Sequence, residues 1–458
     1  MSIQELETAD AFAIPDVSKP APDARPLLVV FLFLLFLIPA GLVVGAMGAP
    51  GAPAALFSLL LLVWWLAGQI MYHEWNAPGR HPIRLMVMVF FVSAMLSFVV
   101  GNILGLHDLE ASGADRGMLS ILGWVGLTLV ACDMLRSRES IDRLLQTLTY
   151  LVTFVAFLGI VQFVTHIDIA NMISIPGLTP NGNLNGSFNR SGFLRVSATT
   201  SHPIEFGVMV ASTYPLALHY ALDDPRASKF VRWLVVVILT IAVPLSVSRS
   251  AILGLAVGMV VLLVSWPAPR RWFAVMVSPL ILIGMRVVMP GLLGTLFSGF
   301  THQDDSIKGR TDDYAVIGTY IDRSPFVGTG FGTFIPKKFI ILDNQYLGSA
   351  VEMGYVGCAV LVLLMVVGFA TARGVVRRAA DSQTRSLGVS LSASILVLAV
   401  TFVTFDGLGF PIAAGMLFLF LGVIGALWRV VGGPSGVQRV PKLKKRRGSR
   451  LSVGTQRV

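Results

Sequence analysis

Several arginines in polar segments between apolar stretches have the chemistry and setting to bind a phosphate group. Arg249 lies in PLSVSRSAILGLAVG, between two serines at a tight turn, and Arg195 lies in GFLRVSATTSHPIEFG, just before an apolar segment. Arg310 and Arg323 belong to the segment IKGRTDDYAVIGTYIDRSPFVGTGFGTF. Because a guanidinium group presents a planar fork of donors that matches phosphate oxygens, these side chains could hold a phosphorylated substrate.

Each of these arginines also has a simpler interpretation, which the sequence leaves open. Arg249 could extend to the interface between lipid and water. Arg195 could be a solvated loop cation, and Arg323 could cap the C-terminus of a helix that the spacing predicts over residues 311–321. Arg286, in an apolar segment, could face a site or only the membrane interface.

Asp343, in FIILDNQYLG, is the candidate general base. It follows the apolar KFIIL and precedes a long apolar stretch, where a carboxylate could be partly desolvated and so accept a proton more readily. Such a group could deprotonate a hydroxyl. Asp343 or Asn344 could equally be the N-cap of the helix that follows, and the sequence does not separate these two interpretations.

The sequence does not predict a metal site or a nucleotide-binding loop. There is no H-E-x-x-H pattern or cysteine cluster, and Cys132 and Cys358 both lie in apolar runs, so we expect no catalytic metal and no other cofactor. The glycines of SPFVGTGFGTF lack the preceding strand that a dinucleotide fold requires. We predict that they allow close approach of the backbone to a ligand or to another helix.

The elements that must position these residues are predicted to be transmembrane helices. The 458-residue chain is 55% hydrophobic and 13% charged with a mean hydropathy of +0.76, whereas soluble proteins carry roughly 25% charged residues. Windows of about 20 apolar residues predict an all-α integral membrane protein with about twelve transmembrane helices. The windows are 26–48, 51–72, 83–104, 118–135, 144–165, 203–222, 230–247, 250–266, 272–293, 346–371, 387–405 and 408–431.

Basic residues cluster in every second loop, which predicts a multi-pass protein of the cytoplasmic (inner) membrane with both termini in the cytoplasm. Residues 1–25 are predicted to be a disordered tail, 26–431 a polytopic membrane domain, and 432–458 a basic cytoplasmic tail. The long outer loops are expected at about residues 166–202 and 294–345. Since the basic clusters read as topology signals, no nucleic-acid partner is expected.

Outward arginines beside a carboxylate, framed by lipid-facing helices, suit a substrate with a phosphate head and a lipid tail. The arginine charge can stabilise a diphosphate leaving group. Outside the cell no nucleotide donor is available, so the energy for group transfer would have to come from a lipid diphosphate.

Three segments together resemble the O-antigen ligase and O-antigen polymerase superfamily of bacterial membrane glycosyltransferases. They are the S-x-S-R-[SA] turn at residues 246–250, the arginine-to-glycine loop at residues 310–334, and DNQYLGSAVEMGYVG, in which Asn344, Gly354 and Gly357 have the family spacing. Arg195 with the SHPIEFG that follows is a fourth, weaker match. The resemblance covers residues 195–357.

The resemblance implies a helical GT-C-like fold and an inverting, metal-independent transfer of glycan from a polyprenyl diphosphate. It implies Asp343 as the catalytic residue, and it places diphosphate or substrate contacts at Arg195, Arg249, Arg310, Asn344, Arg323 and Arg286. The implied partners are a polyprenyl-diphosphate-linked glycan, a glycan or glycolipid acceptor and membrane lipid, and other polysaccharide-assembly proteins could join them.

Asp343 stands where ligases that attach glycan to a lipid A core usually have histidine, and Asp-Asn resembles polymerases or exopolysaccharide relatives. We therefore expect polymerisation of lipid-linked repeat units first and ligation to another acceptor second. The alternative function is a polytopic transporter or lipid flippase. A transporter would predict ionisable residues deep in the spans, which here are nearly free of charge apart from Asp133, Arg286 and Glu352.

Overall fold

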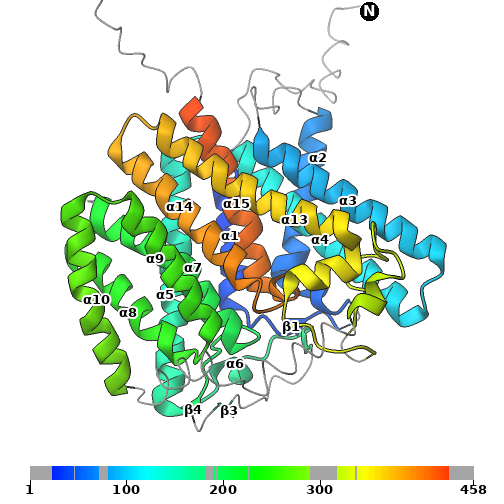
Figure 1. Ribbon diagram of the computed structural model, residues 1–458, viewed down its shortest axis with the longest axis horizontal. Coiled ribbons are helices and arrows are strands. Elements are labelled where there is room, and N and C mark those ends of the chain that lie inside the picture. The colour runs from blue at the N-terminus through cyan, green and yellow to red at the C-terminus, as the bar shows by residue number, and fades with distance from the viewer. Residues whose placement is uncertain are drawn as a thin grey trace, which may run out of the picture.

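The chain folds into a bundle of α-helices, seen in a computed structural model (Figure 1). The structure describes residues 23–45, 47–71, 81–181, 189–190, 193–224, 226–288, 317–335 and 338–432. The long helices are α1 (Arg25–Leu37), α2 (Pro53–Met71), α3 (Pro82–Leu104), α4 (Asp108–Met134), α5 (Arg138–Thr165), α7 (Pro203–Asp223), α8 (Lys229–Leu245), α9 (Arg249–Ser265), α10 (Ala268–Val288), α13 (Gln345–Arg378), α14 (Ser382–Thr401) and α15 (Pro411–Gly432). The short elements are β1 (Leu42–Val43), η2 (Ala49–Gly51), α6 (Ile169–Met172), β2 (Thr179–Pro180), β3 (Asn189–Arg190), β4 (Phe193–Leu194) and η4 (Gly407–Gly409).

The long helices confirm the predicted all-α membrane class. Within the described residues, seven of them are long and apolar enough to cross a membrane, and α1 and α9 are shorter apolar helices. Each predicted window overlaps one long helix. A helix satisfies its own backbone groups, which lipid cannot do. The number of spans stays a prediction.

Capping residues explain why several helices begin where they do. Asp381 accepts a hydrogen bond from Thr384 N at 2.7 Å, and Ser137 accepts one from Ser140 N at 3.0 Å. Short polar side chains at this position satisfy backbone donors that the first turn leaves open. These capping residues therefore mark where helices begin more sharply than the apolar windows do.

The connections gather at the two ends of the bundle. At one end, β1 pairs with β2 in antiparallel register, with Leu42 opposite Pro180, and α7, α13 and α15 begin (Figure 1, bottom). We call this end the loop face and the other end the opposite face. On the opposite face, Arg226 pairs with Asp142 at 2.7 Å and Arg270 with Asp223 at 2.7 Å. The basic residues that predict orientation thus also tie helices together.

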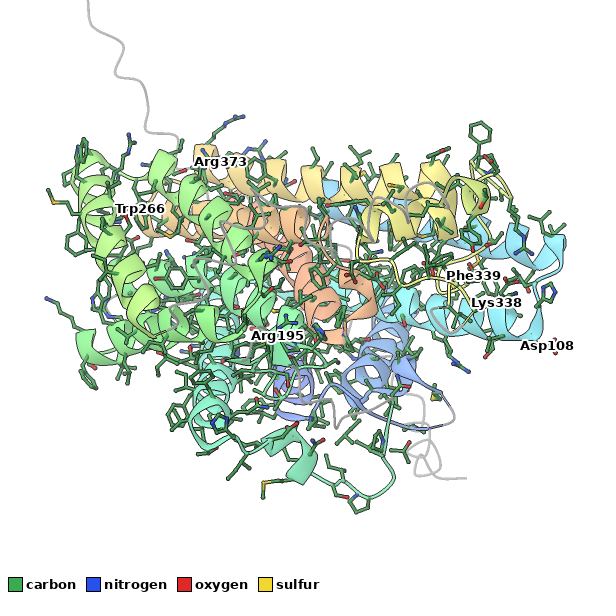
Figure 2. The ribbon with its side chains drawn as sticks, turned by 60° about the horizontal axis from the view of Figure 1, so that its bottom comes forward. Asp108, Arg195, Trp266, Lys338, Phe339 and Arg373 are labelled. Atoms are coloured by element: carbon green, nitrogen blue, oxygen red, sulfur yellow. The ribbon has the colours of Figure 1, made fainter. Side chains whose placement is uncertain are left out.

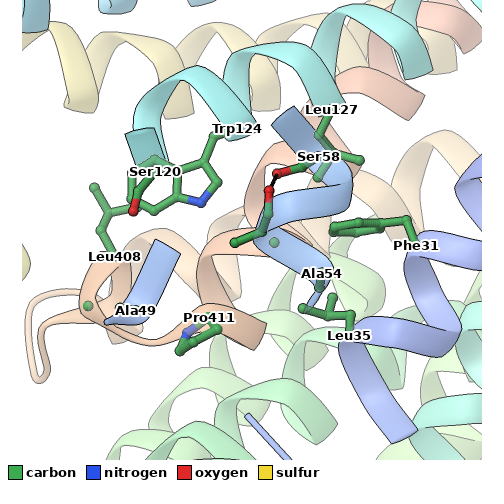
Figure 3. Close-up of a pocket in the computed structure, with 13 residues that line it drawn as sticks. Phe31, Leu35, Ala49, Ala54, Ser58, Ser120, Trp124, Leu127, Leu408 and Pro411 are labelled. Atoms are coloured by element: carbon green, nitrogen blue, oxygen red, sulfur yellow. Dashed lines mark hydrogen bonds between the residues drawn. The ribbon is translucent and has the colours of Figure 1, made fainter. Parts of the chain in front are cut away.

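Helix α15 is the central element of the bundle. Its apolar window is 89% buried within the protein, compared with 28% for α2, so α2 contributes mainly to the outer surface. Trp124 of α4 stacks on Phe418 of α15 with ring centroids 5.1 Å apart. A small apolar cavity of about 50 Å³ remains between α1, α2, α4 and the start of α15, with Phe31 and Trp124 in its wall (Figure 3).

The glycine-rich segment SPFVGTGFGTF packs against helices. This is one of the two predicted possibilities, the other being close approach to a ligand. A Cβ added to Gly101 of α3 would lie 1.8 Å from the Thr329 carbonyl oxygen, and one added to Gly117 of α4 would lie 2.0 Å from the Phe331 oxygen. Such distances are far inside van der Waals contact. The glycines of both helices therefore permit the segment to lie directly on their backbones.

A break in α13 provides the third wall for this segment. Gly354 has φ +67°, which interrupts the helix. The carbonyl of Glu352 accepts hydrogen bonds from Thr329 N at 2.8 Å and Gly330 N at 2.9 Å, and its carboxylate accepts one from Phe334 N at 3.2 Å. A buried carboxylate is stabilised by such donors. The loop is thus fixed to α13 shortly after Asn344.

Replacing Gly117 with alanine should destabilise the protein. The added methyl group meets backbone rather than a flexible side chain, and overpacking of this kind costs about 1–3 kcal/mol. Gly348→Ala is the matched control, because a Cβ there meets nothing within 4 Å and alanine favours a helix. Thermal unfolding of purified protein in detergent should show a lower midpoint for Gly117→Ala only. Equal midpoints for both variants would contradict the packing described.

Candidate functional site

The turn that carries Arg249 is joined directly to the segment that carries Arg195. The Nε of Arg195 donates to the carbonyl of Ser246 at 3.2 Å, and Val196 N donates to Leu245 O at 3.3 Å. Three residues further, Arg249 is the first residue of α9, behind the N-cap Ser248. Two of the arginines predicted to bind substrate therefore lie at one place on the loop face.

The backbone is strained where these two segments meet. Val247 has φ +44° and Ala198 has φ +48°. L-residues rarely adopt this region, least of all a β-branched one, and each such residue costs on the order of 1–3 kcal/mol. The surrounding contacts must hold both segments in place against this strain, so the positions of Arg195 and Arg249 are fixed by the fold.

The structure distinguishes Asp343 from Asn344, which the sequence could not do. Asn344 is the N-cap of α13, and its side chain accepts from Tyr346 N at 3.0 Å and Leu347 N at 3.3 Å. Asp343 precedes the cap and is exposed. The cap is therefore Asn344, and the role of Asp343 as a general base stays a prediction.

His202 lies within electrostatic reach of both Arg195 and Asp343. It caps α7, and its Nδ1 accepts a hydrogen bond from Ile204 N at 3.1 Å. The pKa of His202 is lowered to about 4, mainly by burial and also by the charge of Arg195, while Asp343 acts in the opposite direction. The imidazole is therefore neutral at neutral pH, with its proton on Nε2.

Asp406 is a second carboxylate beside Asp343. Burial raises the pKa of Asp406 to about 6, and the negative charge of Asp343 acts in the same direction. Gln345 fixes this loop to the start of α13: its backbone N donates to Phe402 O at 2.9 Å, and its side-chain oxygen accepts from Leu408 N at 2.6 Å.

The buried Glu205 connects the His202 helix to the central helix. Its carboxylate accepts from Ser201 N at 2.8 Å in its own chain segment and from Ile412 N at 2.7 Å and Ala413 N at 3.3 Å at the start of α15. Carboxylates are favoured at a helix N-terminus. The loop between α14 and α15 is thus pinned from both sides, by Gln345 and by Glu205.

Arg323 does not join this group. It lies 3.4 Å from Glu110, which Lys338 also contacts at 2.9 Å. Lys338 lies at one end of the molecule, away from Arg195 (Figure 2). Arg310 lies outside the described residues, and of Arg286 the structure describes only its place in α10.

The described residues contain one cluster of potential metal ligands. Atoms of His81, Cys132 and Asp133 lie within 4.8 Å of one another on the opposite face. Asp133 accepts a hydrogen bond from Trp65 Nε1 at 3.0 Å and lies 3.5 Å from Arg84. A guanidinium so close to the carboxylate disfavours a second cation there, so the cluster is better explained as an ion pair.

Sequence reasoning missed His202 and Asp406 as members of the site. Both residues stand in segments that the sequence marks as polar connections: His202 lies in SHPIEFG and Asp406 in the acidic FDGLG. Nothing in the spacing showed that these connections would meet, because Glu205 and its partners on α15 are more than 200 residues apart along the chain.

Comparison with known families tests the resemblance. Residues 234–362 match the family model described as O-antigen ligase. No curated protein matches the chain. The match supports the predicted resemblance to the O-antigen ligase and polymerase superfamily.

The matched segment runs from α8 to the first half of α13. It includes Arg249, Asp343 and Asn344, whereas Arg195, His202 and Asp406 lie outside the matched segment. The geometry therefore completes a site that the family match covers only in part.

His202 should make the protein sensitive to acid. Its folded pKa of about 4 is below the ordinary 6.5, so the unfolded chain takes up a proton first, and the associated stability is lost as pH falls from about 6.5 to 4. His202→Asn keeps a good N-cap but cannot titrate. In detergent, the unfolding midpoint of the wild type should fall more than that of His202→Asn between pH 7 and pH 4.5. Parallel curves would contradict the environment described for His202.

Proposed function

We propose that this protein polymerises or transfers polyprenyl-diphosphate-linked oligosaccharide units on the outer face of the cytoplasmic membrane, as an inverting, metal-independent glycosyltransferase. The main support is that Arg195, the Arg249 turn and Asp343 lie on one face of the bundle. Residues 234–362 of the same chain match the O-antigen ligase family model. Polymerisation is the first choice, because Asp343 occupies the place where lipid A core ligases usually have histidine.

In the proposed reaction, an acceptor hydroxyl attacks the anomeric carbon of the lipid-linked glycan. Asp343 takes the hydroxyl proton, the new C–O bond forms, and the bond between the anomeric carbon and the diphosphate oxygen breaks. The electron pair leaves with the polyprenyl diphosphate. Attack from the face opposite the leaving group inverts the anomeric centre. Asp343 is exposed and so accessible to a hydroxyl.

Arg195 and Arg249 are proposed to bind the diphosphate. A cation at the N-terminus of a helix is opposed by the helix dipole, and Arg249 is the first residue of α9. An anion bound at this turn would interact favourably with both the guanidinium and the open backbone donors of the helix. The positive charge needed to stabilise the leaving group would then come from arginine side chains. Arg310, Arg286 and Asn344 stay proposed contacts of secondary rank, whereas Arg323, which pairs with Glu110, is not proposed as a diphosphate contact.

The loop face is proposed to be the outer face. The basic, ion-paired opposite face would then lie in the cytoplasm, with both termini. This orientation places Asp343 and the arginines where a lipid-linked glycan is presented after export.

Replacing Asp343 with asparagine should lower glycan transfer by roughly 10²–10⁴-fold, since a general base contributes about this much. Arg195→Lys and Arg249→Lys should each lose at least about tenfold, because lysine keeps the charge but not the fork. Arg143→Lys is the control, since Arg143 forms an exposed pair with Glu139 on the opposite face. The measurement is elongation or transfer of a lipid-linked glycan by purified variants.

If Asp343→Asn transfers glycan at the wild-type rate, Asp343 is not the general base. If both lysine variants transfer glycan at the rate of Arg143→Lys, Arg195 and Arg249 do not form the diphosphate site. The glycan profile of a deletion strain separates the two modes. Loss of long chains with retained single repeats indicates a polymerase, and loss of all attached repeats indicates a ligase.

A further inference from the structure

A polar cavity of about 210 Å³ opens on the loop face next to His202. Its wall combines Asp168, Asn181, Ser197, Thr200, Ser201 and Phe410 with small residues of the α1–α2 connection. We propose that this cavity is a subsite for one uncharged sugar ring of the glycan substrate. The proposal rests on the proposed function and adds that the same site selects a glycan with an uncharged sugar at this position.

The chemistry of the wall matches a sugar. Hydroxyl, amide and carboxylate groups can exchange hydrogen bonds with the hydroxyls of a ring, and the flat side chain of Phe410 offers an apolar surface, the usual mixture in a small-molecule site. Among the described residues that line the cavity, Asp168 is the charged one, and none is an arginine or a lysine. A diphosphate would therefore be repelled here, and a uronic acid would bind less well than a neutral sugar.

The position of the cavity relates it to the reacting groups. Thr200 donates to the carbonyl of His202 at 3.0 Å, and the Phe410 ring lies 6.0 Å from the His202 ring. His202 in turn senses the charges of Arg195 and Asp343. A sugar in the cavity would thus lie next to His202, which is also close enough to Arg195 and Asp343 to feel their charges.

Hydrogen bonds hold the wall of the cavity together. Asn181 N donates to Gly41 O at 2.8 Å, Ala40 N donates to Thr199 O at 2.8 Å, and Ala198 N donates to the Gln162 side chain at 2.8 Å. These bonds connect segments from three parts of the chain. A wall fixed in this way reduces the entropy cost of binding. The volume is below the roughly 300–1,000 Å³ of a site for a drug-sized ligand, so one ring is the appropriate occupant.

Saturation-transfer NMR on the purified full-length protein tests this without relying on activity. The probes are the methyl glycosides of glucose, galactose, mannose and N-acetylglucosamine, with methyl glucuronide as the acidic probe. At least one neutral glycoside should give a signal, and glucuronide a weaker one. Asn181→Leu should weaken the neutral signal about fivefold, from the loss of a hydrogen bond. Asn102→Leu, an exposed change on the loop face outside the cavity, should not.

Asp168→Asn keeps the cap of α6, because asparagine caps as well as aspartate, and removes the charge. It should raise the glucuronide signal towards that of the neutral sugar. Absence of any neutral signal, or equal signals for Asn181→Leu and wild type, would overturn the subsite.

Steady-state kinetics then show whether the bound ring belongs to the acceptor or to the lipid-linked donor. A higher KM of Asn181→Leu for the acceptor assigns the ring to the acceptor, and a higher KM for the lipid-linked donor assigns it to the donor. Unchanged KM values for both would overturn the proposal. Absence of any glycan transfer by the wild-type protein, with intact sugar binding, would instead overturn the proposed function and leave the subsite standing.

Discussion

The arrangement of the loop face depends on the buried carboxylate of Glu205. It accepts hydrogen bonds from the first backbone donors of α15 and from Ser201 next to its own helix. Helix α15 is the most buried of the candidate spans, so this contact fixes the outer parts of the fold to its centre. Removing the carboxylate would leave buried backbone donors without partners, which is costly in a medium that offers no water.

Two consequences follow for the site. His202 stands three residues before Glu205, and the connection that carries Asp406 ends where α15 begins, so both are positioned by the same contact. On the other side, Gln345 attaches that connection to the helix that follows Asp343. A loop held at both ends can keep two carboxylates near each other, at the cost of a raised pKa for Asp406. The arginine turn is held separately, by the hydrogen bonds that Arg195 and Val196 donate to the carbonyls of Ser246 and Leu245.

The sequence predicts the helices well because lipid leaves the chain few alternatives: each apolar window overlaps a long helix. It predicts the close packing of the glycine-rich segment, because glycine alone permits backbone on backbone. It does not decide between Asp343 and Asn344 as the cap, since both residue types cap helices equally well. The membership of His202 and Asp406 depends on contacts between distant segments, which hydropathy and local spacing do not encode. Arg323 is a further example, because its pairing with Glu110 of α4 is equally non-local and keeps it away from the site.

We propose that Arg195 and Arg249 form the diphosphate site of a lipid-linked glycan transferase. An experimental structure of the full chain with undecaprenyl diphosphate tests this most directly. We expect density for the diphosphate against Arg195 and the first turn of α9, on the same side of the bundle as Asp343. Diphosphate density at Arg323 and Lys338, or on the opposite face, would contradict it.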